Sequence, residues 1–196
     1  KKLWDIVQSG ELGKVQIITM NFGSFKEYDM SNRFFNMNLA GGAMLDIGVY
    51  ALSIVRSFLD EQPDEIVSQW KPSPTGSDEQ ATILLKNAQG QMATVALSMH
   101  SKQPKRAMIS LEKGYIEIME YPRADKAVIV DAESGAQTEI TAGDTADALY
   151  YEMQDMEQAV KSGDASAMQL AYSRDVMEIM TKLRKDWGMK YPGEAW

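Results

Sequence analysis

Cysteine is missing from this sequence of 196 residues, which excludes disulfides, thiol nucleophiles and cysteine-ligated zinc. Histidine occurs once, as His100, so a histidine metal site or a Ser-His pair would depend on a single residue. No uninterrupted apolar run approaches the roughly 20 residues of a membrane span, and no charged-then-apolar leader follows Lys1. We therefore expect a cytoplasmic protein with no membrane segment and no metal site.

Basic side chains are also in deficit, because 20 lysines and arginines stand against 28 aspartates and glutamates, for a net charge of −8. Proteins that bind nucleic acids gather Lys and Arg against the phosphates, so we expect no nucleic-acid partner. The remaining composition, with 44% hydrophobic and 24% charged residues, is typical of a folded globular protein.

Apolar periodicity predicts helices at both ends of the chain and strands in its centre. Residues 3–9 have the pattern of a short helix and residues 15–25 that of a strand, and Gly41-Gly42 precede an apolar helix that we expect to end near residue 59. Turn residues then separate seven strand patterns, at residues 66–70, 81–86, 92–99, 107–111, 116–120, 127–130 and 138–141. Two helical stripes follow, formed by Leu149, Met153, Met156 and Val160 and then by Val176, Met180, Leu183 and Trp187.

Strands at this spacing, with no helices between them, favour hairpins. We therefore predict the α+β class, with an open, largely antiparallel β-sheet and helices packed on one face. No repeat, low-complexity tract or linker divides the chain, so we expect residues 1–196 to form a single domain.

His100 ends one predicted strand, in register with Thr94, Ala96 and Ser98 on its more polar side. A lone histidine at such a position is more often exposed or hydrogen-bonded than a ligand or a base. We interpret it as a structural residue.

The segment from Ala40 to Tyr50 carries the clearest chemical signal. Gly41-Gly42 permits a tight turn before a helix, and Gly48 in the helix indicates that another element approaches closely there. Asp46 and Tyr50 are four residues apart, so an α-helix places them on one face, where a carboxylate and a phenol can orient and protonate a substrate oxygen. The alternative is a buried Asp that caps nearby backbone and a Tyr at the edge of the core.

The run Leu39-Ala-Gly-Gly-Ala-Met-Leu-Asp-Ile-Gly-Val-Tyr50 resembles the Gly-Gly…Asp-x-Gly-x-His/Tyr motif of the Gfo/Idh/MocA family. This family includes glucose–fructose oxidoreductase, inositol dehydrogenase and the dihydrodiol dehydrogenases. Further segments are similar in order and spacing, namely residues 9–15, 114–119, 123–128 and 151–163. The resemblance is closest to the tyrosine-bearing dihydrodiol and xylose dehydrogenase branch.

The resemblance implies a two-domain enzyme of which this chain matches the second part, a glyceraldehyde-3-phosphate dehydrogenase-like C-terminal domain. A Gly-x-Gly-x-x-Gly turn after a strand is missing here, as is the family's Glu-Lys-Pro motif with its catalytic lysine. We therefore expect NAD or NADP to be bound mainly by an N-terminal Rossmann domain outside this chain. The chain alone is predicted to bind neither and to be inactive.

By the same resemblance, Tyr50 matches the His/Tyr position that gives or takes the proton at the substrate oxygen. Asp46 matches the motif's Asp, which orients the substrate or the catalytic pair. Arg33 and Phe34 resemble substrate-facing loop positions. The implied substrate is a sugar-like polyol or a dihydrodiol.

Two further hypotheses stay open. Some proteins on this scaffold resemble regulators or ligand-binding proteins that keep the pocket and lose the chemistry. Apolar alternation, as at Val95, Leu97 and Met99 or at Ile109 and Leu111, also leaves a sheet face to be covered. The resemblance points to a homo-oligomer joined through the sheet.

Overall fold

The computed structural model describes residues 1–195. Its helices and strands are α1 (Lys2–Gln8), β1 (Val15–Gly23), α2 (Val49–Phe58), β2 (Glu65–Pro72), β3 (Asp78–Lys86), β4 (Met92–Ser98), β5 (Gln103–Leu111), β6 (Gly114–Met119), β7 (Lys126–Asp131), β8 (Gln137–Thr141), α3 (Ala148–Ser162) and α4 (Leu170–Asp186). All eight strands and four of the helical segments lie where the periodicity predicts them.

One eight-stranded sheet has the order β2-β3-β4-β1-β5-β6-β7-β8. Every neighbouring pair is antiparallel except β1 and β4, which are parallel. This exception arises because the chain leaves β1, crosses the sheet through α2, and returns to build β2, β3 and β4 on the far side of β1. The predicted α+β class with a largely antiparallel open sheet is confirmed.

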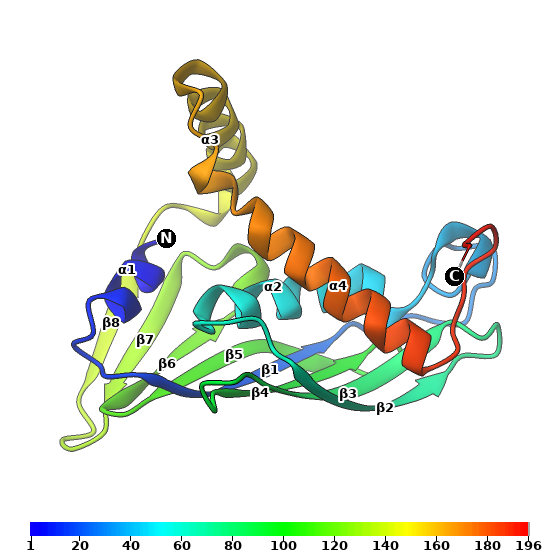
Figure 1. The fold of residues 1–196 in the computed structure, drawn as a ribbon, viewed down its shortest axis with the longest axis horizontal. Coiled ribbons are helices and arrows are strands. Elements are labelled where there is room, and N and C mark those ends of the chain that lie inside the picture. Colours follow the sequence, from blue (N-terminus) through cyan, green and yellow to red (C-terminus); the bar gives the residue numbers. More distant parts are fainter. Residues whose placement is uncertain (196) are drawn as a thin grey trace.

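One face of the sheet carries the core, because alternate side chains of each strand point toward the helices. Figure 1 shows α2 and α4 lying across this face, over fully buried side chains that include Ile18, Met20, Ile83, Val95 and Ile109. No helix covers the opposite face among the described residues, and Val67 and Leu84 are exposed there.

The helix predicted after Gly41-Gly42 begins later and less regularly than expected. Residues Met44–Gly48 form a π-helical turn, which continues into α2. The prediction of a close approach at Gly48 is confirmed, since a Cβ added there would lie 2.9 Å from Leu97 Cδ1 of β4. A π-turn inside a helix is frequent at functional sites.

Residues 37–58 include the one helical stretch of the described chain that is long and apolar enough to cross a membrane. Half of its most apolar window is buried in the fold, and the apolar side chains of α2 pack against the sheet. The core helix of a soluble protein has the same length and composition, so this stretch is weak evidence of membrane insertion.

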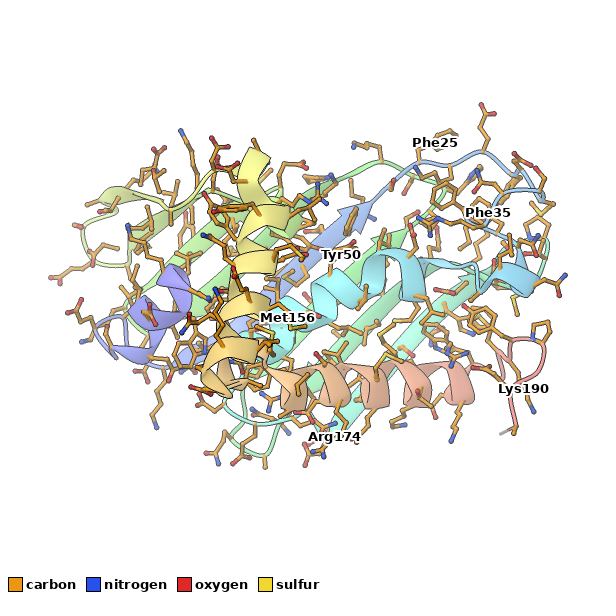
Figure 2. The ribbon with its side chains drawn as sticks, turned by 90° about the horizontal axis from the view of Figure 1, so that it is seen from above. Phe25, Phe35, Tyr50, Met156, Arg174 and Lys190 are labelled. Carbon is orange, nitrogen blue, oxygen red and sulfur yellow. The ribbon has the colours of Figure 1, made fainter. Side chains whose placement is uncertain are left out.

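Helix α3 forms as predicted, but its apolar stripe is not buried. Leu149, Met153, Met156 and Val160 are all more than half exposed. Figure 1 shows α3 rising away from the sheet, and Figure 2 shows Met156 on it from above. The helices lie on one side of the sheet, as predicted, but α3 does not pack against that face.

A buried ion pair joins the two helices that do cover the sheet. Arg56 of α2 donates from Nε to Asp175 of α4 at 2.8 Å, and its guanidinium also donates to Leu59 O at 3.0 Å. Both charged side chains are about nine-tenths buried. This pair and the packing of α4 hold α2 in place beneath the candidate site.

Candidate functional site

The four residues that the resemblance singles out line a single cleft. Arg33 and Phe34 come from the loop after β1, and Asp46 and Tyr50 come from the π-turn and α2. The cleft encloses about 790 Å³ and opens toward solvent. Its remaining walls are Phe22, Ser24, Lys26, Ile47, Lys105, Met119, Glu120, Pro122, Arg123, Ala124, Asp125, Lys126 and Thr145.

Strand topology brings several of those remaining walls together at one end of the central strands. Strand β1 ends there, β5 begins there, β6 ends there and β7 begins there, because these neighbours are antiparallel. Lys105 and Lys126 thereby face the same cleft from strands that are far apart in sequence. Sequence reasoning missed these residues, since only knowledge of which strands pair could have found them.

Asp46 faces the loop and does not cap backbone. Its carboxylate accepts a hydrogen bond from the guanidinium of Arg33, and its side chain is only 16% exposed. The alternative in which Asp46 is a buried cap is therefore wrong. That role belongs to Asp78, whose Oδ2 accepts from the backbone N–H of Met44 at 2.5 Å.

Tyr50 lines the cleft, and its ring packs against other aromatic side chains. The ring lies 6.2 Å from that of Phe22, which in turn meets Tyr121 edge-on at 6.0 Å. Tyr50 is 48% exposed, and no hydrogen bond engages its hydroxyl within residues 1–195. Figure 2 labels Tyr50 on its helix, seen from above. A packed ring with a free hydroxyl suits proton exchange with a bound molecule.

Two cations lie against the ring of Phe34. Lys26 Nζ lies 4.4 Å from the centre of its ring and the Arg33 guanidinium lies 4.6 Å from it. Such cation–π contacts contribute roughly 0.5–1 kcal/mol each at exposed sites. The result is a flat aromatic wall with two positive charges close to it.

The cleft is positively charged although the chain is acidic. Five cationic side chains line it, against three acidic ones, while the whole chain has a net charge of −8. The cations are Lys26, Arg33, Lys105, Arg123 and Lys126, and the acids are Asp46, Glu120 and Asp125. This local excess favours ligands rich in hydroxyl or anionic oxygen.

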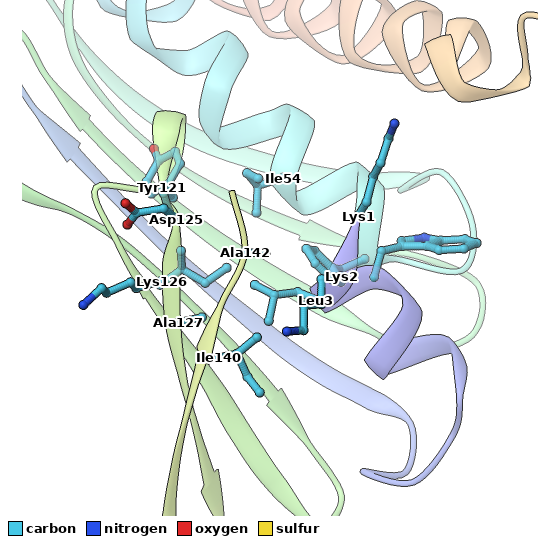
Figure 3. Close-up of a pocket in the computed structure, with 14 residues that line it drawn as sticks. Lys1, Lys2, Leu3, Ile54, Tyr121, Asp125, Lys126, Ala127, Ile140 and Ala142 are labelled. Carbon is cyan, nitrogen blue, oxygen red and sulfur yellow. The ribbon is translucent and has the colours of Figure 1, made fainter. Parts of the chain in front are cut away.

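A smaller cavity of about 240 Å³ lies between α1, α2 and the last strands, as Figure 3 shows. Lys2, Ile54, Tyr121 and Ile140 line it. Burial raises the pKa of the Tyr121 phenol. None of the four predicted site residues lines this cavity, so we assign the site to the larger cleft.

His100 is a structural residue, as predicted. Its Nδ1 lies 2.9 Å from Lys26 O, and its ring stacks on Tyr28 at 4.2 Å and on Phe25 at 5.1 Å. The residue is absent from the cleft. Within residues 1–195 no group of three or more His, Cys, Asp or Glu side chains could hold a metal ion.

Residues 1–117 match the model of the GFO/IDH/MocA C-terminal domain. The chain belongs to the GFO/IDH/MocA family. The matched part contains the cleft residues of the β1 loop and of α2, and it ends in β6.

Curated relatives of this family member include dehydrogenases. The trans-1,2-dihydrobenzene-1,2-diol dehydrogenase of Mus musculus is 24% identical over 199 residues, covering 97% of this chain and 59% of that protein. The enzyme of the same name from Xenopus laevis is 27% identical over 192 residues, covering 92% and 57%. The chain thus spans somewhat more than half the length of the curated relatives it matches.

Solved structures show the same fold. A 3-ketoreductase from Actinomadura kijaniata, solved with TDP-benzene and NADP, superimposes with a TM-score of 0.75 at 18% identity, covering 94% of this chain and 57% of that one. A UDP-N-acetylglucosamine 3-dehydrogenase from Acidithiobacillus ferrooxidans superimposes with a TM-score of 0.69 at 13% identity, covering 92% and 56%. These likenesses concern the architecture of the sheet and its helices.

Proposed function

We propose that this chain is the substrate-binding domain of an NAD(P)-dependent oxidoreductase. The observation that carries the proposal is the meeting of Arg33, Phe34, Asp46 and Tyr50 in one cleft, in a chain that belongs to a family whose curated relatives are dehydrogenases. Tyr50 gives or takes the proton at the substrate oxygen. Tyr50 lines the cleft, its hydroxyl has no hydrogen-bond partner within residues 1–195, and its ring packs against Phe22.

The other cleft residues hold the substrate in place. Asp46 and Arg33 form an ion pair. The guanidinium has further N–H donors and the carboxylate has further lone pairs, so both can also exchange hydrogen bonds with a hydroxylated ligand. The ring of Phe34 provides an apolar surface against which a sugar-like or cyclohexadiene ring can lie. Correct placement of the reacting oxygen at Tyr50 is itself a large part of catalysis.

The chain's own residues do not fit the dinucleotide. The sequence has no Gly-x-Gly-x-x-Gly turn after a strand, and such a turn is what holds a pyrophosphate in a Rossmann domain. When bound, NAD or NADP supplies or accepts the hydride, and we propose that another domain of the full-length protein holds it. What this chain contributes is the proton at Tyr50 and the position of the substrate.

The substrate class that we propose is a sugar-like polyol or a dihydrodiol. The names of the relatives support it, since they include dihydrodiol dehydrogenases, a 3-ketoreductase and a sugar-nucleotide dehydrogenase. The cleft also has the right chemistry, because five cations and an aromatic wall suit a ring with several hydroxyl groups.

We also propose that the protein is a homo-oligomer that pairs through the open sheet face. Exposed Val67, Leu84 and Ile17 lie there, and no helix covers them in the described chain. A second copy can cover such a face symmetrically.

Tyr50→Phe in the full-length protein tests the enzymatic role. General acid–base catalysis contributes about 10²- to 10⁴-fold, so we expect kcat to fall by that order while the Kd for the nucleotide stays the same. Tyr150→Phe is the matched control, because Tyr150 is an exposed tyrosine of α3 outside the cleft. Unchanged turnover in Tyr50→Phe contradicts the role, and a full-length protein that binds polyols without turnover favours a ligand-binding protein on the same scaffold.

A further inference from the structure

Strand β3 begins with two consecutive carboxylates that are both buried. Asp78 is fully buried and Glu79 is 1% exposed, although carboxylates are almost never fully buried without partners. The register of β2 and β3 shifts here, because Lys71 pairs with Gln80 and Pro72 pairs with Asp78. This β-bulge leaves Glu79 as an extra residue, and bulges re-aim side chains. The two carboxylates can therefore reach different elements.

Asp78 reaches the start of the helix that carries Tyr50. Its Oδ2 accepts from the Met44 N–H at 2.5 Å, and Met44 is the first residue of the π-turn. A Cβ added to Gly42 would lie 2.0 Å from Asp78 Oδ1, so the Gly-Gly turn and the carboxylate are packed against each other.

Glu79 reaches the loop that carries Arg33. It accepts hydrogen bonds from the Tyr28 hydroxyl and, at 2.7 Å, from Lys71 Nζ. The Tyr28 ring lies between His100, at 4.2 Å, and Phe35, at 5.0 Å. Fixing Tyr28 therefore fixes the loop a few residues before its cleft residues.

The cleft depends on the contacts of both Asp78 and Glu79, because its residues come from two segments, the loop after β1 and the helix that carries Tyr50. The Arg33 side chain is mostly exposed and forms an ion pair with Asp46. Asp46 belongs to the helix and not to the sheet. Phe35 is fully buried, and its carbonyl accepts from Thr75 Oγ1 in the turn before β3. The loop and the helix thus meet the sheet at the same end of β3.

We propose that Asp78 and Glu79 act as a pair of positioning residues for the cleft. Asp78 fixes the position of the helix start and thereby that of Tyr50. Glu79 fixes the position of the loop and thereby that of Arg33. Neither carboxylate lines the cleft. This inference rests on the proposed function for its catalytic consequence, but its structural part stands on the contacts alone.

Hydrogen–deuterium exchange of the full-length protein tests the structural part without any turnover. In Asp78→Asn we expect faster exchange in residues 42–50 and unchanged exchange in residues 24–36. In Glu79→Gln we expect the reverse. Glu65→Gln is the control, because it breaks an exposed ion pair with Lys86, 2.8 Å long, on the same sheet.

Two further variants keep the test decisive if a buried substitution prevents folding. Tyr28→Phe removes a hydrogen-bond partner of Glu79 from a side chain that is 40% exposed, and it should reproduce the Glu79→Gln pattern. Gly42→Ala pushes a methyl group toward Asp78 Oδ1, and it should reproduce the Asp78→Asn pattern.

Steady-state kinetics of the full-length enzyme test the catalytic consequence. Since misplacement by about 1 Å can cost on the order of 10²-fold, we expect Asp78→Asn to lower kcat by roughly 10- to 100-fold with little change in KM. Glu79→Gln should raise KM by about tenfold with little change in kcat. The inference is overturned if both variants change the same kinetic parameter. It is also overturned if hydrogen–deuterium exchange rises in neither of the two segments, or rises uniformly over the chain. Segment-specific exchange together with normal turnover of Tyr50→Phe instead contradicts only the proposed function.

Discussion

The guanidinium of Arg33 donates a hydrogen bond to the carboxylate of Asp46, and this ion pair closes one side of the cleft. It joins the loop after β1 to the helix that carries Tyr50. The Arg33 side chain is 61% exposed, whereas that of Asp46 is 16% exposed. Water therefore screens the pair from one side, and its role concerns the cleft more than the stability of the fold.

A double-mutant cycle of Arg33→Met and Asp46→Asn measures this relationship. Exposed ion pairs contribute about 0–1 kcal/mol to stability, so neither variant should lower the free energy of unfolding by more than about 1 kcal/mol. Each should lower kcat/KM by about tenfold or more, and the double variant should resemble the worse single variant, because residues that act as a unit are not additive. Additive losses in the double variant would show that the two side chains act separately.

Gly48→Ala tests the packing of the helix on β4. Alanine gains about 1 kcal/mol of helix propensity over glycine, but its methyl group would lie 2.9 Å from Leu97 Cδ1 and 3.0 Å from Met44 Sδ. Because both neighbours are buried and overpacking costs about 1–3 kcal/mol, we expect a net loss of about 1 kcal/mol in urea unfolding. Adding Leu97→Val should restore it. Net stabilisation by Gly48→Ala would contradict the close approach.

The buried carboxyl of Asp78 predicts an unusual pH dependence of stability. Burial raises its pKa to about 7, against opposing effects of the Met44 N–H and of the nearby Arg184 charge. The folded state thus holds a proton that the unfolded state, with an ordinary carboxyl pKa near 4, releases. The stability contributed by this group is therefore present at low pH and lost as pH rises from about 4 to about 7.

Urea unfolding of the wild type and of Asp78→Asn at several pH values measures this effect. Asn cannot titrate, so the difference between the two proteins isolates the carboxyl. We expect the wild type to lose about 2–3 kcal/mol relative to the variant between about pH 5 and about pH 8. A constant difference across this range would show that the Asp78 carboxyl titrates normally.

The open sheet face predicts self-association. We expect multi-angle light scattering to show a dimer or larger species at micromolar concentration, because exposed Val67 and Leu84 lie on a face that no described helix covers. Leu84→Lys should shift the protein toward a monomer. Met153→Lys, on the exposed stripe of α3, is the comparison. If only this variant dissociates, the contact between copies lies on α3. A monomeric wild type would contradict self-association.

Much of the fold could be predicted from the sequence because local patterns report local geometry. Alternation at residues such as Ile83 and Leu85 marks a strand with one buried face, and turn residues between such runs mark hairpins. Gly48 in an apolar helix correctly indicated a close neighbour. The parallel pairing of β1 with β4 was not predictable, since it depends on where the chain returns after α2.

The candidate site was predictable in part. Asp46 and Tyr50 lie near each other in sequence, so their common side of one helix followed from spacing, whereas the meeting of Arg33 with Asp46 required the loop to fold back. Asp78 and Glu79 gave no signal at all, because a β-bulge decides where their side chains point.

The sequence by itself determined which segments are strands and helices, where the motif of the cleft lies, and that cysteine chemistry and disulfides are excluded. Only the tertiary structure decided which of the predicted apolar surfaces are covered. The stripe of α3 and that of α4 have the same period, yet Met153 is exposed and Met180 is buried. The physical reason is that periodicity records the conformation of one segment, whereas burial depends on a second segment that lies against it.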